Sequence, residues 1–179
     1  MADNLVFYTN PMSRGRIVHW MLEEVGAPYR MEILSFDKNE HKAPAICTYL
    51  ADAFPKAELA PALDDPARGT YLRWMFFGAG CIEPAIMDRM FERPAQPPPM
   101  SLGYGSYDAT LNALEKAVTP GPFVLGERFS AVDVYLASQI GWGMGTKALE
   151  ARPAFERYSA RCTDRPAFKR FIEASPMPS

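Results

Sequence analysis

Residues 123–137, FVLGERFSAVDVYLA, contain the clearest local structural signal in the sequence. Ser130 is followed three residues later by Asp133, the spacing of a capping box, in which two side chains satisfy backbone N–H groups at a helix start. Phe129 and Val134 have the spacing of a hydrophobic staple across the same start. The stretch therefore predicts a helix that begins after Ser130, and its role is in folding rather than in catalysis. Its predicted buried face consists of Val132, Leu136 and Ile140.

Helical patterns flank this stretch on both sides, and prolines mark their ends. Proline accounts for 17 of the 179 residues, close to twice its usual share of about 5%. Long apolar patterns run over residues 65–90 and 104–118, and Pro153 and Pro166 precede two further helices. The prolines thus indicate helix boundaries and not disorder. The predicted buried face of the first long helix consists of Leu72, Met75, Phe76, Ala79, Ile82, Ile86 and Met90.

Pro84 is the exception, because it lies inside the first long helix. Its ring would clash with the carbonyl of Gly80, and the neighbouring Gly78 would ease a bend. The sequence therefore predicts a kink at this point. A kink either shapes a pocket or is purely structural, and both readings stay open.

The N-terminal third has a different pattern. Residues 5–8 predict a short buried strand, residues 13–25 a helix ended by Gly26, and residues 29–36 a second strand. A strand, a helix and a strand at this spacing form a parallel pair, and a short helix over residues 46–54 follows. The resulting division is residues 1–54 as an α/β domain, 55–64 as a linker and 65–179 as an all-helical domain.

Composition excludes several functional classes. The chain is 48% hydrophobic and 22% charged with a formal net charge of -2, which gives no electrostatic reason to expect nucleic acid or membrane partners. No apolar run approaches the roughly 20 residues of a membrane span, and residues 1–8 do not form a signal peptide. The three cysteines, Cys47, Cys81 and Cys162, are too far apart for a disulfide framework or a metal cluster. We therefore expect a cytoplasmic protein with no metal.

Residues 10–16, NPMSRGR, lie where the first strand meets the first helix and carry the strongest chemical signal. The free N–H groups of a helix N-terminus favour an anion. The Ser13 hydroxyl could donate a hydrogen bond to a bound thiolate and lower its pKa, and Arg14 and Arg16 add positive charge. The alternative is that Ser13 is only a helix cap. No histidine or acid stands close by in the sequence to make Ser13 a nucleophile.

The two histidines do not form a recognisable motif. His19 falls within the first helix and is expected to be a surface or partly packed residue. His41 is expected in a solvated loop unless a ligand anion lies near it. The sequence also has no glycine-rich phosphate loop and no paired carboxylates.

The order of these features resembles that of the cytosolic glutathione transferases, and bacterial Ser-type members most of all. The resemblance implies an α/β plus all-α fold, with a thioredoxin-like N-terminal domain that binds glutathione and a helical C-terminal domain that holds the second substrate. It also implies a homodimer, with glutathione as co-substrate and a small hydrophobic electrophile as partner. The stretches that carry it are residues 5–29, 37–44 (DKNEHKAP), 45–55 (AICTYLADAFP), 123–137 and 152–171 (RPAFERYSARCTDRPAFKRF).

The resemblance also implies roles for individual residues. Ser13 stands where Ser-type members keep their thiol-activating residue, so it is the candidate catalytic residue. For Trp74 and Phe77, packing in the core is the alternative to a role in the second-substrate pocket. The candidates for glutathione binding are Tyr8, Asn10, Met12, Arg14 and His41, and those for the second-substrate pocket are Met12, Trp74 and Phe77.

One departure from the family pattern affects the glutathione site. Family members have two more strands after this point, a cis-proline that follows Val, and an acidic-Ser pair that opens the next helix. Here residues 43–45 run directly into Ile46, although two strands and their turn need roughly 20 residues. Pro44 therefore does not take the cis-proline role, and the thioredoxin-like domain is predicted to be truncated. The region is either distorted, or borrows strands from a partner, or lacks a segment that relatives have.

Three functions remain open on the sequence. The first is a glutathione transferase, and the second is a non-catalytic binding or interaction protein built on the same scaffold, which the missing strands favour. The third is a thiol oxidoreductase that uses Cys47, although this residue has no Cys-x-x-Cys partner and could simply pack in its helix.

Overall fold

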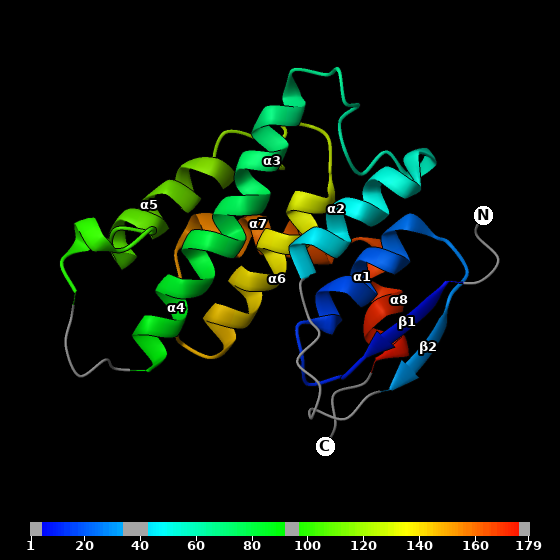
Figure 1. Ribbon diagram of the computed structural model, residues 1–179, viewed down its shortest axis with the longest axis horizontal. Helices are drawn as coiled ribbons and strands as arrows, with labels where there is room; N and C mark the ends of the chain where they lie inside the picture. The colour runs from blue at the N-terminus through cyan, green and yellow to red at the C-terminus, as the bar shows by residue number, and fades with distance from the viewer. Residues whose placement is uncertain (1–4, 34–42, 92–96, 176–179) are drawn as a thin grey trace.

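The computed structural model describes residues 5–33, 43–91 and 97–175, with the elements arranged as in Figure 1. A short parallel sheet and its helices lie at one end, and the remaining helices extend away from them. The strands are β1 (Val6–Thr9) and β2 (Arg30–Ile33), and the helices around them are α1 (Gly15–Val25) and α2 (Ala43–Ala53). The other helices are α3 (Ala67–Phe77), α4 (Glu83–Met90), α5 (Tyr107–Val118), α6 (Ala131–Gly145), α7 (Pro153–Thr163) and α8 (Pro166–Ala174). Short turns of 3₁₀ type are η1 (Pro55–Ala57) and η3 (Pro99–Ser101), and η2 (Gly78–Ile82) is a π-helical turn.

The sheet confirms the predicted strand, helix and strand. β1 and β2 pair in parallel, with Val6 opposite Arg30 and Thr9 opposite Ile33. Within the described residues the sheet has these two strands alone, and Pro44 lies in the first turn of α2 rather than next to a strand. The truncated thioredoxin-like arrangement expected from the sequence is therefore present.

The predicted kink before Pro84 is a π-helical turn. α3, η2 and α4 follow one another without a break, and η2 contains the two glycines of the sequence GAGCI. A π turn has a wider ring of hydrogen bonds than an α-helix, which makes room for a residue that cannot donate its own N–H. Gly78 is needed for a second reason, because a Cβ there would lie 2.5 Å from Cε1 of Tyr135 on α6.

The buried face of this helix differs in part from the prediction. Met75, Ile82 and Ile86 are buried as expected, but the Phe76 side chain is 72% exposed. The face that packs on α6 runs through Tyr71, Met75 and Gly78, so Phe76 points away from it. Met90, at the end of α4, is also exposed.

α6 is the central helix, and it is buried on nearly all sides. It contacts α1, α2, α3 and α7, and its residues from Ala131 to Ala137 are all buried. A helix covered on every side is expected to be apolar all round, and Asp133 is the charged exception. The predicted capping box between Ser130 and Asp133 is present.

α8, near the C-terminal end of the described residues, packs against α1. α8 packs along α1, beside the sheet (Figure 1). Arg165 Nη2 lies 2.8 Å from Glu24 Oε2, and the Glu24 side chain is only 2% exposed. The Phe168 ring meets the Trp20 ring edge-on at a centroid distance of 4.7 Å. α1 is thus covered by residues that come more than 140 positions later in the chain.

Helix boundaries agree with the proline and cap signals, with three corrections. α1 begins at Gly15 and not at Ser13. α5 begins at Tyr107 and not at Tyr104, because Ser106 caps it by accepting a hydrogen bond from the N–H of Ala109 at 3.2 Å. α2 begins at Ala43, earlier than the predicted residue 46. Residues 34–36 of the predicted strand 29–36 lie outside the described residues. No helix in the described ranges is long and apolar enough to cross a membrane.

Candidate functional site

The turn between β1 and α1 places Ser13 at the N-terminus of α1. Ser13 Oγ donates a hydrogen bond to the carbonyl oxygen of Asn10 at 2.7 Å and accepts one from the N–H of Gly15 at 3.0 Å. A Cβ on Gly15 would overlap Thr9 Oγ1, so only glycine allows α1 to start this close to β1. The half-buried hydroxyl of Ser13 therefore lies at the positive end of the helix dipole.

The neighbours of Ser13 shape this turn and expose part of it. The side-chain oxygen of Asn10 accepts a hydrogen bond from the N–H of Met12 at 2.8 Å. The Met12 side chain is mostly exposed, and so is Tyr8, which alternates along β1 with the buried Phe7 and Thr9. An exposed strip of predicted glutathione-binding residues thus runs along β1 and into the turn.

The structure separates the two arginines that follow Ser13. Arg14 Nη2 lies 2.5 Å from Glu83 Oε1, and both side chains are partly exposed. Arg16 points the other way, where its Nη1 donates a hydrogen bond to the carbonyl oxygen of Ser175 at 3.2 Å. Only Arg14 therefore belongs to the surroundings of Ser13.

Glu83 is a residue that the sequence did not suggest for this site. It is the first residue of α4 and follows the π turn directly. The Glu83–Pro84 step at the predicted kink is the signal that could have identified it. The kink thus brings a carboxylate to the start of α1.

Trp74 and Phe77 lie on α3 and contact each other. Their rings meet edge-on at a centroid distance of 5.1 Å, and both are half-buried against the main hydrophobic core. Among the described residues no hydrogen bond, ion pair or ring contact joins them to the Ser13 turn. His41 lies outside the described residues.

The buried cysteine and histidine bear on two of the sequence expectations. Cys47 is fully buried in α2, and burial raises the pKa of its thiol to about 12, which makes it a poor nucleophile. The oxidoreductase alternative therefore loses its main candidate. The expectation for His19 was wrong: the side chain is 1% exposed, because α8 covers this face of α1.

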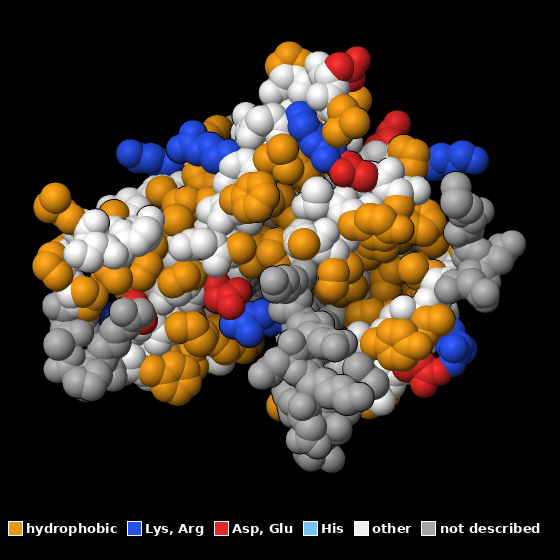
Figure 2. All heavy atoms as spheres, viewed as in Figure 1, with side chains coloured by type: hydrophobic (Ala, Val, Ile, Leu, Met, Phe, Trp, Pro, Cys, Tyr) orange, Lys and Arg blue, Asp and Glu red, His pale blue; other side chains and the backbone are white. Residues whose placement is uncertain are grey.

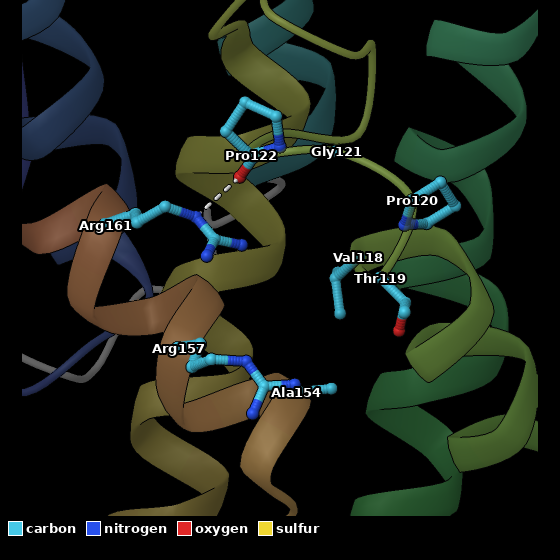
Figure 3. Close-up of a pocket in the computed structure, with 8 residues that line it drawn as sticks. All are labelled: Val118, Thr119, Pro120, Gly121, Pro122, Ala154, Arg157 and Arg161. Carbon is cyan, nitrogen blue, oxygen red and sulfur yellow. Dashed lines mark hydrogen bonds between the residues drawn. The ribbon is translucent and has the colours of Figure 1, made fainter.

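Ser13 lines neither of two cavities that the described residues form. The first, of about 290 Å³, lies between α7 and the segment after α5 (Figure 3). Arg157 and Arg161 line it from α7, and Arg161 Nε donates a hydrogen bond to the carbonyl oxygen of Pro122 at 3.1 Å. The second, of about 230 Å³, lies next to the carboxyl ends of β1 and β2. In the part of the chain that is described, no cluster of three or more His, Cys, Asp or Glu residues could hold a metal ion.

Comparison with known proteins relates the chain to one family. Residues 84–174 match the family described as glutathione S-transferase, C-terminal domain. A comparison with curated proteins finds no match.

Several solved structures share the fold over almost their whole length. The chain is 19% identical to BphK, a bacterial GST solved as a ternary complex, covering 97% of this chain and 100% of that one with a TM-score of 0.77. It is 21% identical to a glutathione transferase homologue from Sulfitobacter with bound glutathione, covering 99% and 100% with a TM-score of 0.76. A sphingomonad glutathione S-transferase complexed with glutathione is also 21% identical, covering 97% and 100% with a TM-score of 0.75. At these identities the likeness establishes the fold.

Proposed function

The chain belongs to the glutathione S-transferase family, and from that premise we propose that it binds glutathione and joins the glutathione thiolate to a small hydrophobic electrophile. The Sulfitobacter and sphingomonad proteins that share its fold were solved with glutathione bound. The observation that carries the proposal is the Ser13 hydroxyl at the N-terminus of α1. In this reaction the protein needs to position two substrates and to stabilise an anion.

Ser13 can stabilise the thiolate without moving its backbone. Its oxygen keeps the hydrogen bond from the Gly15 N–H, while its proton turns from the Asn10 carbonyl oxygen to the sulfur. The thiolate form then gains a hydrogen bond and the favourable field of the helix dipole, and both lower the pKa of the thiol. A larger fraction of bound glutathione is thus reactive at neutral pH.

A non-catalytic binding protein on the same scaffold is the second candidate. The observation that favours it is the two-stranded sheet, because the described residues offer no further strand on the free side of β1. That side is where a bound peptide-like ligand would find backbone N–H and C=O groups. Glutathione would then be held by the Ser13 turn, Tyr8, Arg14 and His41 alone.

The proposal includes the wider organisation of the protein. We propose the division into residues 1–54, 55–64 and 65–179, a homodimer, and a cytoplasmic location. Exposed apolar side chains gather over α2 and α3 in Figure 2, and Tyr49 and Phe76 are among the exposed residues of these helices. A surface of this kind is suited to contact with a second copy, and light scattering of the purified protein tests the dimer.

Titration of glutathione into the purified protein, followed by a conjugation assay with a chlorodinitrobenzene electrophile, separates the two candidates. The transferase predicts saturable binding and enzyme-dependent conjugation. Cys47→Ser is the matched control and should leave the rate unchanged. Binding without conjugation would establish the non-catalytic candidate, and a folded protein with neither property would overturn the proposal.

A further inference from the structure

A chain of short hydrogen bonds connects α8, α1 and the segment before β2. Ser175 Oγ lies 2.5 Å from Nδ1 of His19, and Nε2 of His19 lies 2.6 Å from the hydroxyl of Tyr29. The Tyr29 hydroxyl donates to Oε1 of Glu23 at 2.7 Å. None of these residues belongs to the proposed glutathione site.

The hydrogen bonds determine where each proton lies. Tyr29 gives its single hydroxyl proton to Glu23, so its oxygen accepts from the Nε2–H of His19. With the proton on Nε2, Nδ1 of a neutral imidazole carries a lone pair, and the Ser175 hydroxyl donates to it. The network therefore assigns His19 as the base that faces the Ser175 hydroxyl.

Burial and neighbouring charged groups act on both ends of this hydrogen-bonded chain. Arg170 on α8 forms an ion pair with Glu23, with 3.0 Å between Nε and Oε2. Burial lowers the pKa of His19, the nearby Arg16 lowers it further, and Glu23 opposes them. His19 is therefore a neutral base at neutral pH. The charged and titratable groups that face it are Arg16 and Glu23 from α1, Tyr29 from the segment before β2, and Ser175 from the end of α8.

A cavity opens next to Ser175. It has a volume of about 230 Å³, and Ser175, His19, Arg16 and Thr9 form its polar wall. Arg16 donates from Nη1 to the carbonyl oxygen of Ser175 at 3.2 Å, so its guanidinium lies beside this residue. Among the described residues no carboxylate forms an ion pair with Arg16. The apolar wall consists of Pro11, Met31, Ile33 and Ala174.

We propose that Ser175 is a nucleophile activated by His19, and that this cavity accepts small acyl esters. Ser175 Oγ forms a bond to the acyl carbon while its proton passes to Nδ1 of His19. The bond between the acyl carbon and the alcohol oxygen then breaks, and His19 returns the proton to the leaving alcohol. Water releases the carboxylic acid by the same route and restores Ser175. Arg16 stabilises the oxyanion formed in each half of the reaction.

In this site Tyr29 and Glu23 are positioning residues. The cationic imidazole that forms during attack keeps its hydrogen bond to the Tyr29 oxygen, and the negative charge of Glu23 stabilises it through that hydroxyl. The reaction involves neither Ser13 nor glutathione, so it stands or falls independently of the transferase proposal.

Labelling of the full chain with a fluorophosphonate probe tests the proposal directly. Ser175 Oγ would form a bond to phosphorus while fluoride leaves, and peptide mass spectrometry would locate the adduct. We expect one adduct, on Ser175, together with release of p-nitrophenolate from p-nitrophenyl acetate. Ser175→Ala should abolish both, and Ser101→Ala, which removes an exposed serine of η3, should leave both unchanged.

A second variant distinguishes the activation of Ser175 by His19 from the packing of the Tyr29 ring. Tyr29→Phe keeps the ring but removes the link to Glu23, so the acylation rate should fall about tenfold or more. The pH at which the rate rises should also move, because His19 loses the partner of its Nε2–H. An unlabelled wild-type protein, an adduct on another residue, or an adduct that persists in Ser175→Ala would each overturn the proposal.

Discussion

Ser13 and Ser130 lie at the starts of α1 and α6, and these two serines serve different purposes. At α6, Ser130 and Asp133 complete a capping box, and the Asp133 carboxylate accepts hydrogen bonds from Val124, Ser130 and Tyr158. At α1, the first turn contains no acid, and Ser13 is half-buried in the β1–α1 turn. Where the helix itself supplies a carboxylate, as at α6, the serine is used for capping the helix. Where none is supplied, the positive end of the helix stays available for an external anion.

Asp133→Ala should have the largest effect. The substitution leaves four donors without their acceptor. Three are buried, namely the N–H and hydroxyl of Ser130 and the hydroxyl of Tyr158, and the fourth is the half-buried N–H of Val124. Because unsatisfied buried donors are costly, the free energy of unfolding should fall by about 3 kcal/mol or more. Urea denaturation measures it, and Asp133→Asn, which keeps one acceptor oxygen, is the control. A loss below about 1 kcal/mol would mean that the box at α6 does not anchor the helix.

The two serines can be compared through matched alanine variants. Ser13→Ala should lower kcat/KM for conjugation by about tenfold to a hundredfold, because the thiolate loses one hydrogen bond, while the melting temperature stays close to wild type. Ser130→Ala should cost about 1 kcal/mol of stability and leave the activity per folded molecule unchanged. Ultraviolet titration of bound glutathione would show a raised thiol pKa for Ser13→Ala alone. The reverse pattern would refute the assignment of roles to the two helix starts.

A smaller effect is the pH dependence of stability that His19 on α1 contributes. Burial holds the pKa of His19 below its ordinary value in the folded state, so the unfolded chain binds more protons as the pH falls below about 6.5. The contribution of neutral His19 to stability is therefore complete above this pH and is lost as the pH falls through the folded-state pKa. His19→Gln should flatten this part of the pH–stability curve, measured by urea denaturation at several pH values. An unchanged slope would show that His19 titrates alike in both states.

The elements that the sequence predicted correctly depend on neighbours in the chain. The capping box of α6, the end of α1 at Gly26 and the starts of α7 and α8 all follow from residues within one helical turn. The partners that the sequence did not reveal come from distant positions. Tyr158, which completes the shell of Asp133, lies 25 residues away, and Ser175, which meets His19, lies 156 residues away.

The candidate site shows the same division. The Ser13 turn was predictable because a strand end and a helix start follow each other in the sequence. The Arg14–Glu83 ion pair could not be predicted, because it depends on where the π turn places Glu83, the first residue of α4. The position of Phe76 depends in the same way on which face of α3 meets α6, which periodicity alone left undecided.

The packing of α8 on α1 has a consequence for the order of folding. α1 is synthesised early, but the cation that neutralises its buried Glu24 is Arg165, 141 residues later. Contacts between such distant segments close a long loop and form late. We therefore expect α1 to become stable only after α8 has been synthesised. The two helices then fold and unfold together as one cooperative unit.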